Sequence, residues 1–290
     1  MAGYIPGQQL AGRTATLGGI TLGAVDAGGI AWTLDRDGLQ GWDGTDVRTE
    51  YSERTSDHGS WAGPTYLTHR VITLTGKIVA PDLAALDVAV EQLLAAASLT
   101  DTLLTVAESI PKQALVRRSG RPLVRLETDR IASWSLLLTA ADPRRYSTTL
   151  QSQSTALPSV TGGLTLPITL PITISTTTVA GSFILTNAGS IATRPVLTIT
   201  GPVTTPAIVA SLPDGSVRQL TYSDTLASGD VLVIDCGART AVLNGSVSRR
   251  RYLSGQWPEI PPGSQATFQW SAASYSPSAL LAGTCRAAWM

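Results

Sequence analysis

Prolines and glycines between Gly162 and Pro202 constrain this chain more than any other feature. Pro167 and Pro171 interrupt an otherwise β-prone run, and a proline has no N–H to donate inside a sheet. Two short β-prone runs follow at 183–187 and 196–200, joined through Asn, Gly and Pro residues that favour turns. The stretch therefore predicts an extended connector followed by a separate all-β unit.

Length and composition predict two domains. The chain has 290 residues, of which 43% are hydrophobic, enough to bury one or two sizeable cores. Residues from Thr149 to Gly162 are rich in Ser, Thr and Gln without periodicity, as in exposed linkers. We expect an N-terminal domain over 1–148, an extended linker over 149–180, and a C-terminal domain over 181–290.

The N-terminal domain is predicted to be α+β, with one helix on an antiparallel sheet. Apolar and polar residues alternate from Val71 to Ile78, which indicates a half-buried strand, and a loop is expected over 57–64. Pro81 and Asp82 begin a helix whose predicted apolar face is Leu83, Leu86, Val90, Leu93, Leu94 and Ala97. Further strands are expected at 103–106, 113–118, 122–127 and 131–140.

The C-terminal domain is predicted to be a β-sandwich, which makes the whole fold mainly β. Asp214-Gly215 and Asn244-Gly245 are strong hairpin signals, an apolar run spans 231–234, and a final strand is expected through Phe268 and Trp270. Short strands separated by frequent turns are typical of a sandwich.

Charge is sparse and unevenly distributed. Charged residues make up 14% of the chain and sum to zero, which argues against binding to nucleic acid or an anionic membrane by bulk charge. Residues 1–108 carry thirteen acids and six bases, whereas 109–146 carry eight bases and three acids. The first residues show no secretion signal and no run is long enough to span a bilayer, so we expect a protein made in the cytosol that stays soluble.

No catalytic constellation stands out, so no catalytic residue is predicted. Acid–base or nucleophilic chemistry usually needs a histidine near a nucleophile or carboxylate, and His58 and His69 are the two histidines. Asp57, His58 and Ser60 lie too close in sequence to form a triad on one rigid element. Both histidines are interpreted as ordinary loop and strand residues.

No metal or cofactor site is predicted either. Asp35, Asp37, Asp43 and Asp46 lack the spacing of a calcium loop, and Cys236 and Cys285 are interpreted as two buried thiols. The glycine pairs at 18–19, 28–29 and 162–163 lack the following Lys or helix of a phosphate-binding loop. They are interpreted as turns.

Two clusters in the C-terminal half leave a binding role open. Arg249-Arg250-Arg251 could hold a phosphate or carboxylate, although a solvated strand edge or a protein contact is the commoner role. Trp257 and Trp270 could stack on a sugar, whereas core packing is the commoner role for Trp in sandwiches.

Several turns and strand ends occur in an order that resembles the distal tail protein family of siphophages. The residues that carry the resemblance are Thr75–Ile78, Asp142-Pro143-Arg144-Arg145-Tyr146, Gly162-Gly163, Asn187-Ala188-Gly189, Arg194-Pro195, Gly201-Pro202, Gly229-Asp230, Asn244-Gly245, Trp257, Pro262-Gly263 and Trp289. The resemblance covers most of the chain. It implies a C-terminal sandwich that is galectin-like.

The resemblance also implies a structural, non-enzymatic role in the virion, at the distal end of the tail, after assembly in the host cytoplasm. It implies a homo-oligomeric, sixfold ring of N-terminal domains that joins the tail tube to the tip or baseplate, with DNA passing through the lumen unbound. The implied partners are the tail tube, tape measure, tip hub and receptor-binding proteins, with no membrane. The alternatives are a carbohydrate-binding tail module and, less favoured, a glycan-degrading tail enzyme.

Overall fold

A computed structural model of the chain describes residues 13–161 and 177–290, and it confirms the expected mainly β fold. The chain divides into two compact units, Met1–Thr148 together with Met290, and Thr149–Trp289. Within the described ranges, no helix is long and apolar enough to cross a membrane. Gly162-Gly163, Pro167 and Pro171, on which the expected connector rests, lie outside the described residues.

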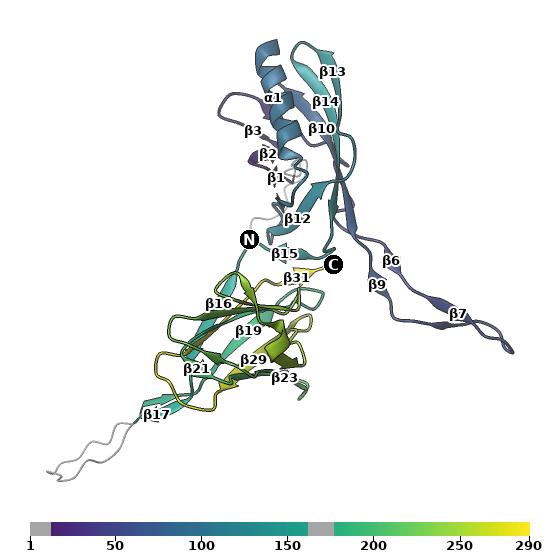
Figure 1. The fold of residues 1–290 in the computed structure, drawn as a ribbon. Helices are drawn as coiled ribbons and strands as arrows, with labels where there is room; N and C mark the ends of the chain where they lie inside the picture. The colour runs from purple at the N-terminus through teal and green to yellow at the C-terminus, as the bar shows by residue number, and fades with distance from the viewer. Residues whose placement is uncertain (1–12, 162–176) are drawn as a thin grey trace, which may run out of the picture. The chain divides into compact units, whose positions relative to one another are not determined.

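The first unit is built on an antiparallel sheet (Figure 1). Its strands follow the order β2 (Ile20–Leu22), β1 (Ala15–Leu17), β11 (Thr102–Val106), β12 (Lys112–Arg118), β14 (Ile131–Ala140), β10 (Arg70–Val79), β4 (Ala31–Trp32) and β3 (Ala24–Val25). Strand β13 (Leu123–Thr128) pairs with β14, β15 (Arg145–Ser147) with β12, and β5 (Leu39–Gln40) with β10. The predicted strands at 71–78, 103–106, 113–118, 122–127 and 131–140 are confirmed.

Strands β10 and β14 form the centre of this sheet. They pair over ten residues, from Arg70 opposite Ala140 to Val79 opposite Ile131, and alternate buried with more exposed positions. Gly76 is required where the segment after β4 runs alongside β10, because a Cβ there would lie 1.9 Å from the carbonyl oxygen of Thr33. Thr33 uses this close approach to donate its N–H to the Lys77 carbonyl. The Thr75–Ile78 motif therefore marks the place where the backbone of Thr33 lies directly against the backbone of β10.

One helix covers this sheet, as the sequence predicts (Figure 1). Helix α1 (Leu83–Ala96) begins where the Asp82 carboxylate accepts the N–H of Ala85 at 2.8 Å. Its buried stripe is Leu86, Ala89, Leu93 and Ala96. The prediction was wrong for Leu83, which is 47% exposed. Leu83 lies seven and eleven residues before Val90 and Leu94, so it shares their partly open face and not the buried stripe.

The second unit is a sandwich of two antiparallel sheets. One has the order β16 (Gln151–Ala156), β30 (Leu280–Cys285), β20 (Val196–Thr200), β25 (Val231–Asp235), β26 (Thr240–Leu243) and β27 (Val247–Ser248). The other has the order β19 (Ser182–Asn187), β29 (Ser264–Ser271), β22 (Ala207–Ser211), β23 (Val217–Tyr222) and β28 (Leu253–Gly255). Both predicted hairpins form, and the second has positive φ at Asn244 and Gly245.

Short elements complete this unit. They are β17 (Ser159–Thr161) paired with β18 (Thr177–Val179), β21 (Val203–Thr204) paired with β24 (Thr225–Leu226), the 3-10 helix η1 (Arg250–Tyr252), and β31 (Ala288–Trp289). The core between the two sheets includes Leu185, Leu197, Ile199, Ile208, Leu220, Leu232, Ile234, Phe268 and Leu281.

The linker expected over 149–180 is contradicted at its start. Residues 151–156 form β16, which pairs with β30 over six positions. This strand is at the edge of its sheet and none of its side chains is buried, so it shows no apolar alternation. A polar edge strand and a polar linker have the same composition, and the strand is therefore missed in the sequence.

The Asn187-Ala188-Gly189 motif carries the chain from one sheet of the sandwich to the other. The buried Asn187 side chain donates its amide to the carbonyls of Ile191, Ile260 and Pro261, and its oxygen accepts the N–H groups of Gly189 and Ala288. Gly189 has no room for a Cβ, which would lie 1.8 Å from the Ala288 carbonyl oxygen. One side chain therefore replaces the backbone pairing that the crossover interrupts.

Replacing Asn187 by Ala should destabilise the sandwich strongly. The change leaves several buried backbone groups unpaired, and each costs about 1–3 kcal/mol, so the free energy of unfolding should fall by at least about 2 kcal/mol. Urea denaturation measures it. Gln265→Ala, at an exposed position of β29, is the control and should change stability by less than about 0.5 kcal/mol. Equal stability of the two variants would contradict this role.

Candidate assembly site

A two-stranded ribbon over residues 43–69, which we call the arm, extends from the sheet of the first unit (Figure 1). Strand β6 (Val47–Arg48) pairs with β9 (Tyr66–Leu67), and β7 (Tyr51–Glu53) pairs with β8 (Ser60–Ala62). Every residue from 51 to 62 is exposed. The loop expected over 57–64 is thus partly strand, since Ser60–Ala62 belong to β8.

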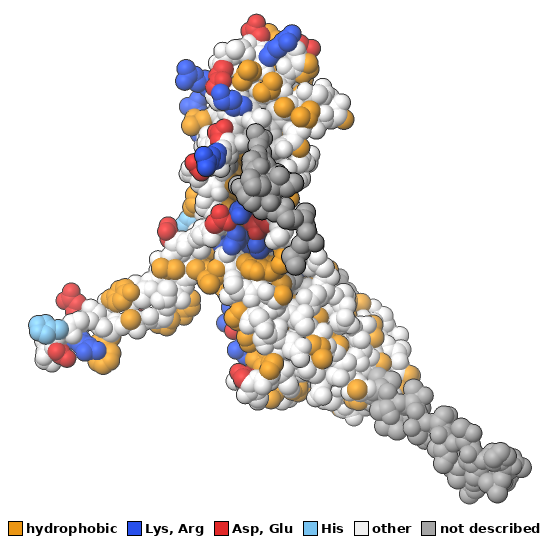
Figure 2. All heavy atoms as spheres, turned by 180° about the vertical axis from the view of Figure 1, so that it is seen from behind, with side chains coloured by type: hydrophobic (Ala, Val, Ile, Leu, Met, Phe, Trp, Pro, Cys, Tyr) orange, Lys and Arg blue, Asp and Glu red, His pale blue; other side chains and the backbone are white. Residues whose placement is uncertain are grey.

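Three large aromatic side chains of the arm are more than half exposed. Tyr51 is 67% exposed, Trp61 65% and Tyr66 57%, and Arg54 lies over the Trp61 ring at 4.4 Å. Figure 2 shows hydrophobic side chains along the arm and charged ones at its tip. The arm also contains five acids and two arginines. It is therefore an acidic surface with exposed aromatic groups.

A fully buried arginine fixes the root of the arm. Arg70 Nη1 donates to the carbonyls of Gly41, Trp42 and Gly44 at 2.7–3.0 Å, and Nε donates to the Pro143 carbonyl at 2.8 Å. Burial, and then the nearby Arg145 cation, lower the pKa of Arg70 to about 10. The guanidinium therefore remains charged at neutral pH and ties the arm to the Asp142–Tyr146 motif.

A second polar cluster lies beside this root, at Glu108. Its carboxylate accepts the Trp42 Nε1–H at 2.6 Å and a short ion pair from Lys112, and Arg145 Nη1 lies 3.9 Å away. Burial alone would raise the pKa of Glu108, but Lys112, Trp42 and Arg145 together hold that pKa below its ordinary value. The cluster fixes Trp42, whose side chain is fully buried.

The histidines and aspartates considered in the sequence are not brought together. His58 is exposed in the turn at the arm tip and His69 is exposed at the arm root. Asp35 begins a turn by accepting the Gly38 N–H through its carbonyl, whereas the Asp43 carboxylate contacts Arg13 and Arg145. Across residues 13–161 and 177–290, no group of three or more His, Cys, Asp or Glu side chains is arranged to hold a metal.

The cysteines and aromatic candidates of the sandwich are structural. Burial raises the pKa of the Cys236 thiol to about 12 and that of Cys285 to about 11, which confirms two buried thiols. Trp270 is in the core and donates Nε1–H to the Ala156 carbonyl. Trp257 packs on the core while Arg250 lies over its ring at 4.9 Å. Trp270 is therefore closed to sugar stacking, and the Arg250 guanidinium occupies a face of the Trp257 ring.

The arginine triplet is used within the sandwich. Arg249 contacts Asp224 at 3.7 Å, Arg250 donates to the Leu253 carbonyl, and Arg251 donates to the Tyr252 hydroxyl. All three guanidinium groups also lie over aromatic rings. The triplet therefore does not converge on one external ligand.

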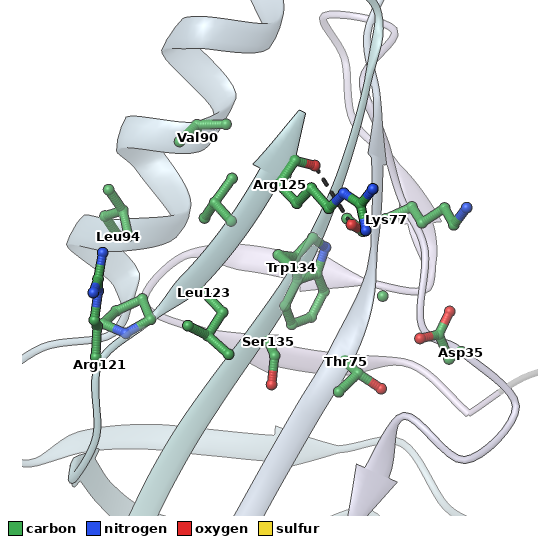
Figure 3. A pocket seen from close by; sticks show the side chains of 14 residues that line it. Asp35, Thr75, Lys77, Val90, Leu94, Arg121, Leu123, Arg125, Trp134 and Ser135 are labelled. Carbon is green, nitrogen blue, oxygen red and sulfur yellow. Dashed lines mark hydrogen bonds between the residues drawn. The ribbon is translucent and has the colours of Figure 1, made fainter. Parts of the chain in front are cut away.

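A cavity of about 610 Å³ opens between α1 and strands β13, β14 and β10 (Figure 3). Val90 and Leu94 of the helix face Leu123 and Trp134 across it, and Lys77 and Arg125 lie near its rim. Asp35 is the one carboxylate among the described lining residues, and no histidine or cysteine lines it. The cavity therefore lacks an acid–base pair.

Comparisons with known proteins point to phage tails. Residues 188–278 match the family described as "Siphovirus-type tail component, C-terminal domain". The structure of the Dit protein of phage SPP1 aligns with 96% of this chain and 99% of its own, with a TM-score of 0.62 and 12% identity. A chain of the phage P2 baseplate aligns with 94% of this chain and 97% of its own, with a TM-score of 0.47 and 11% identity. No curated protein sequence matches the chain.

The resemblance to siphophage distal tail proteins is confirmed. The sequence match lies inside the second unit and begins one residue after Asn187. The structural similarity to SPP1 Dit extends over both units and shows that they share its fold. The arm belongs to the part of the chain outside the sequence match, so its role must be argued from its own contacts.

Replacing Arg70 by Met should release the arm root. The change removes the partner of four backbone carbonyls at a fully buried site, so we expect a loss of at least about 3 kcal/mol in the free energy of unfolding. Hydrogen exchange at residues 41–48 should also become faster. Exposed Arg36→Met is the control and should change neither quantity. An unchanged exchange rate in Arg70→Met would show that the guanidinium does not hold the root.

Replacing Glu108 by Gln should make the free energy of unfolding less dependent on pH in the acidic range. Because the folded-state pKa lies below the ordinary value, about 4.3, the carboxylate stabilises the fold above that pH. This contribution is lost as pH falls through the lowered pKa. Urea midpoints from pH 7 to pH 3 should therefore converge between wild type and Glu108→Gln.

The comparison variant is Glu127→Gln, at a more exposed carboxylate whose pKa is lowered chiefly by its hydrogen bond from Lys77. Solvent screening should make its effect smaller. A constant difference between wild type and Glu108→Gln across the pH range would refute the assignment.

Proposed function

We propose that this protein is a non-enzymatic structural component of a siphophage tail tip, and that its first unit forms a ring through the arm. The single observation that carries the ring is the arm itself, a two-stranded ribbon whose aromatic side chains are exposed. The family resemblance supports the place in the virion.

A two-stranded ribbon is at best marginally stable alone in water. The arm is such a ribbon, and it also exposes aromatic side chains at Tyr51, Trp61 and Tyr66. Aromatic residues are enriched in protein interfaces. Its root is nevertheless held by the buried Arg70. A rigid root with an uncovered ribbon fits an element whose second layer comes from another molecule.

A second copy of the chain is the occupant that charge favours. The arm has five acids and two arginines, whereas residues 109–146 have eight bases and three acids. Opposite net charges on two segments of one chain favour a head-to-tail contact, which closes into a ring when the rotation allows it. The sixfold number comes from the family resemblance and not from this count.

The other partners follow from the proposed position at the tip of the tail. The ring would join the tail tube to the tip, with tape measure, hub and receptor-binding proteins as neighbours and the sandwiches facing outward. DNA would pass through a lumen formed by the first unit. A net negative lumen would prevent phosphate from adhering to it. SPP1 Dit, described as a paradigm of the hub adsorption apparatus in phages that infect Gram-positive bacteria, is the precedent for this place.

A non-enzymatic role is supported by the chemistry of the described residues. The two histidines are exposed and apart, and the α1 cavity lacks an acid–base pair. The cysteine thiols are buried, with pKa values raised by burial.

Substituting the arm aromatics should abolish the ring without unfolding the chain. We expect wild type to form sixfold rings and Tyr51→Ser/Trp61→Ser to remain monomeric, because the interface loses its apolar anchors. Mass photometry and negative-stain electron microscopy at low and high salt measure this. Tyr275→Ser is the matched control, since Tyr275 is 58% exposed in the second unit, and it should form rings.

Three outcomes would overturn the proposal. They are a monomeric wild type at every salt concentration, rings that persist in the arm variant, and a ring whose lumen is formed by residues 181–290.

A further inference from the structure

Three arginines that are distant in sequence converge on one cavity of the sandwich. The cavity has a volume of about 370 Å³ and is lined by Arg194, Arg218 and Arg239, with Trp257, Glu259 and the buried Cys236. Arg194 precedes β20, Arg218 lies in β23, and Arg239 lies in the turn between β25 and β26. The fold therefore assembles a basic cavity that no run in the sequence indicates.

Two of the arginines are held in place by the cavity's own carboxylate. Glu259 accepts a hydrogen bond from Arg194 Nε at 3.4 Å and lies 3.6 Å from Arg218 Nη2. Arg218 Nη1 also donates to the Trp257 carbonyl at 3.2 Å. These contacts orient both guanidinium groups, which reduces the side-chain entropy that a ligand would have to remove.

The third arginine is not neutralised. Arg239 is exposed in its turn and makes no hydrogen bond or ion pair with any residue of the described ranges. The nearby Asp235 carboxylate is turned to the backbone, because its Oδ1 accepts the N–H groups of Gly237 and Ala238. Three guanidinium groups against one carboxylate leave a concave surface with excess positive charge.

We propose that this cavity binds an oxyanion, a phosphate or a carboxylate group. Guanidinium groups bind both through paired, charge-assisted hydrogen bonds. Recognition by sugar stacking is disfavoured, since Trp257 packs on the core and Arg250 covers its ring. The charged group of the ligand, and not an apolar face, therefore determines binding. The site is independent of the ring proposed above.

Titration of the full chain with small anions tests the site. Inorganic phosphate, glycerol 1-phosphate, acetate and N-acetylglutamate, followed by amide chemical shifts at constant ionic strength, separate phosphate from carboxylate ligands. We expect saturable shifts at Arg194, Arg218 and Arg239 with at least one of the two classes. Absence of saturable binding with all four probes would overturn the proposal.

Variants at Arg239 distinguish specific recognition from bulk charge. Its exposed turn position allows Arg239→Ala without disturbing the core, and binding should weaken at least tenfold. Arg239→Lys keeps the charge but loses the planar fork, so it should also weaken binding measurably. Arg251→Ala removes an equal charge outside the cavity lining and should bind like wild type. Any of three results would refute the site. Arg239→Ala could bind as tightly as wild type, Arg239→Lys could bind without weakening, or Arg239→Ala and Arg251→Ala could lose equal affinity.

Discussion

The burial of the Arg70 guanidinium is the constraint on which the first unit depends. A buried cation normally pairs with a carboxylate, yet the Arg70 guanidinium donates to four backbone carbonyls. Those carbonyls belong to the arm root and to Pro143, so one side chain connects the start of β10 with two segments distant in sequence. The arm has no core of its own, and its direction must therefore be set at this root.

Arg145 makes this arrangement more demanding, because its positive charge also lowers the pKa of Arg70. Two cations near one another require negative charge close by, which Asp43 and Glu108 provide at 3.6 and 3.9 Å from Arg145. Glu108 in turn binds the buried Trp42. The Asp-Pro-Arg-Arg-Tyr motif therefore has a physical basis, as its proline carbonyl and second arginine complete the electrostatics of the arm root.

The sequence predicts those parts of the fold that have one buried and one exposed face. Strands β10 and β14 alternate in burial along their length, and α1 has an apolar stripe, so hydrophobic periodicity identifies all three. The arm and β16 have no such contrast, because residues 51–62 are exposed and β16 is a polar edge strand. Hydrophobic periodicity in a sequence records which side chains are buried by the same chain. A segment that is exposed along its length therefore gives no periodic signal, and the candidate assembly site was missed for this reason.

Sites whose residues are brought together by the fold cannot be predicted from sequence for a different reason. Arg249, Arg250 and Arg251 are adjacent in sequence, yet each lies over an aromatic ring and contacts a different group, so adjacency alone does not build a binding site. Arg194, Arg218 and Arg239 are separated by at least twenty residues and meet because β20, β23 and the turn after β25 end around one cavity. The crossover at Asn187 leads directly into the segment that bears Arg194, since Ile191 and Thr193 are held by Asn187 and Ile260. The Asn187 amide and the Thr193–Ile260 backbone pair thus fix the segment from which Arg194 enters the cavity.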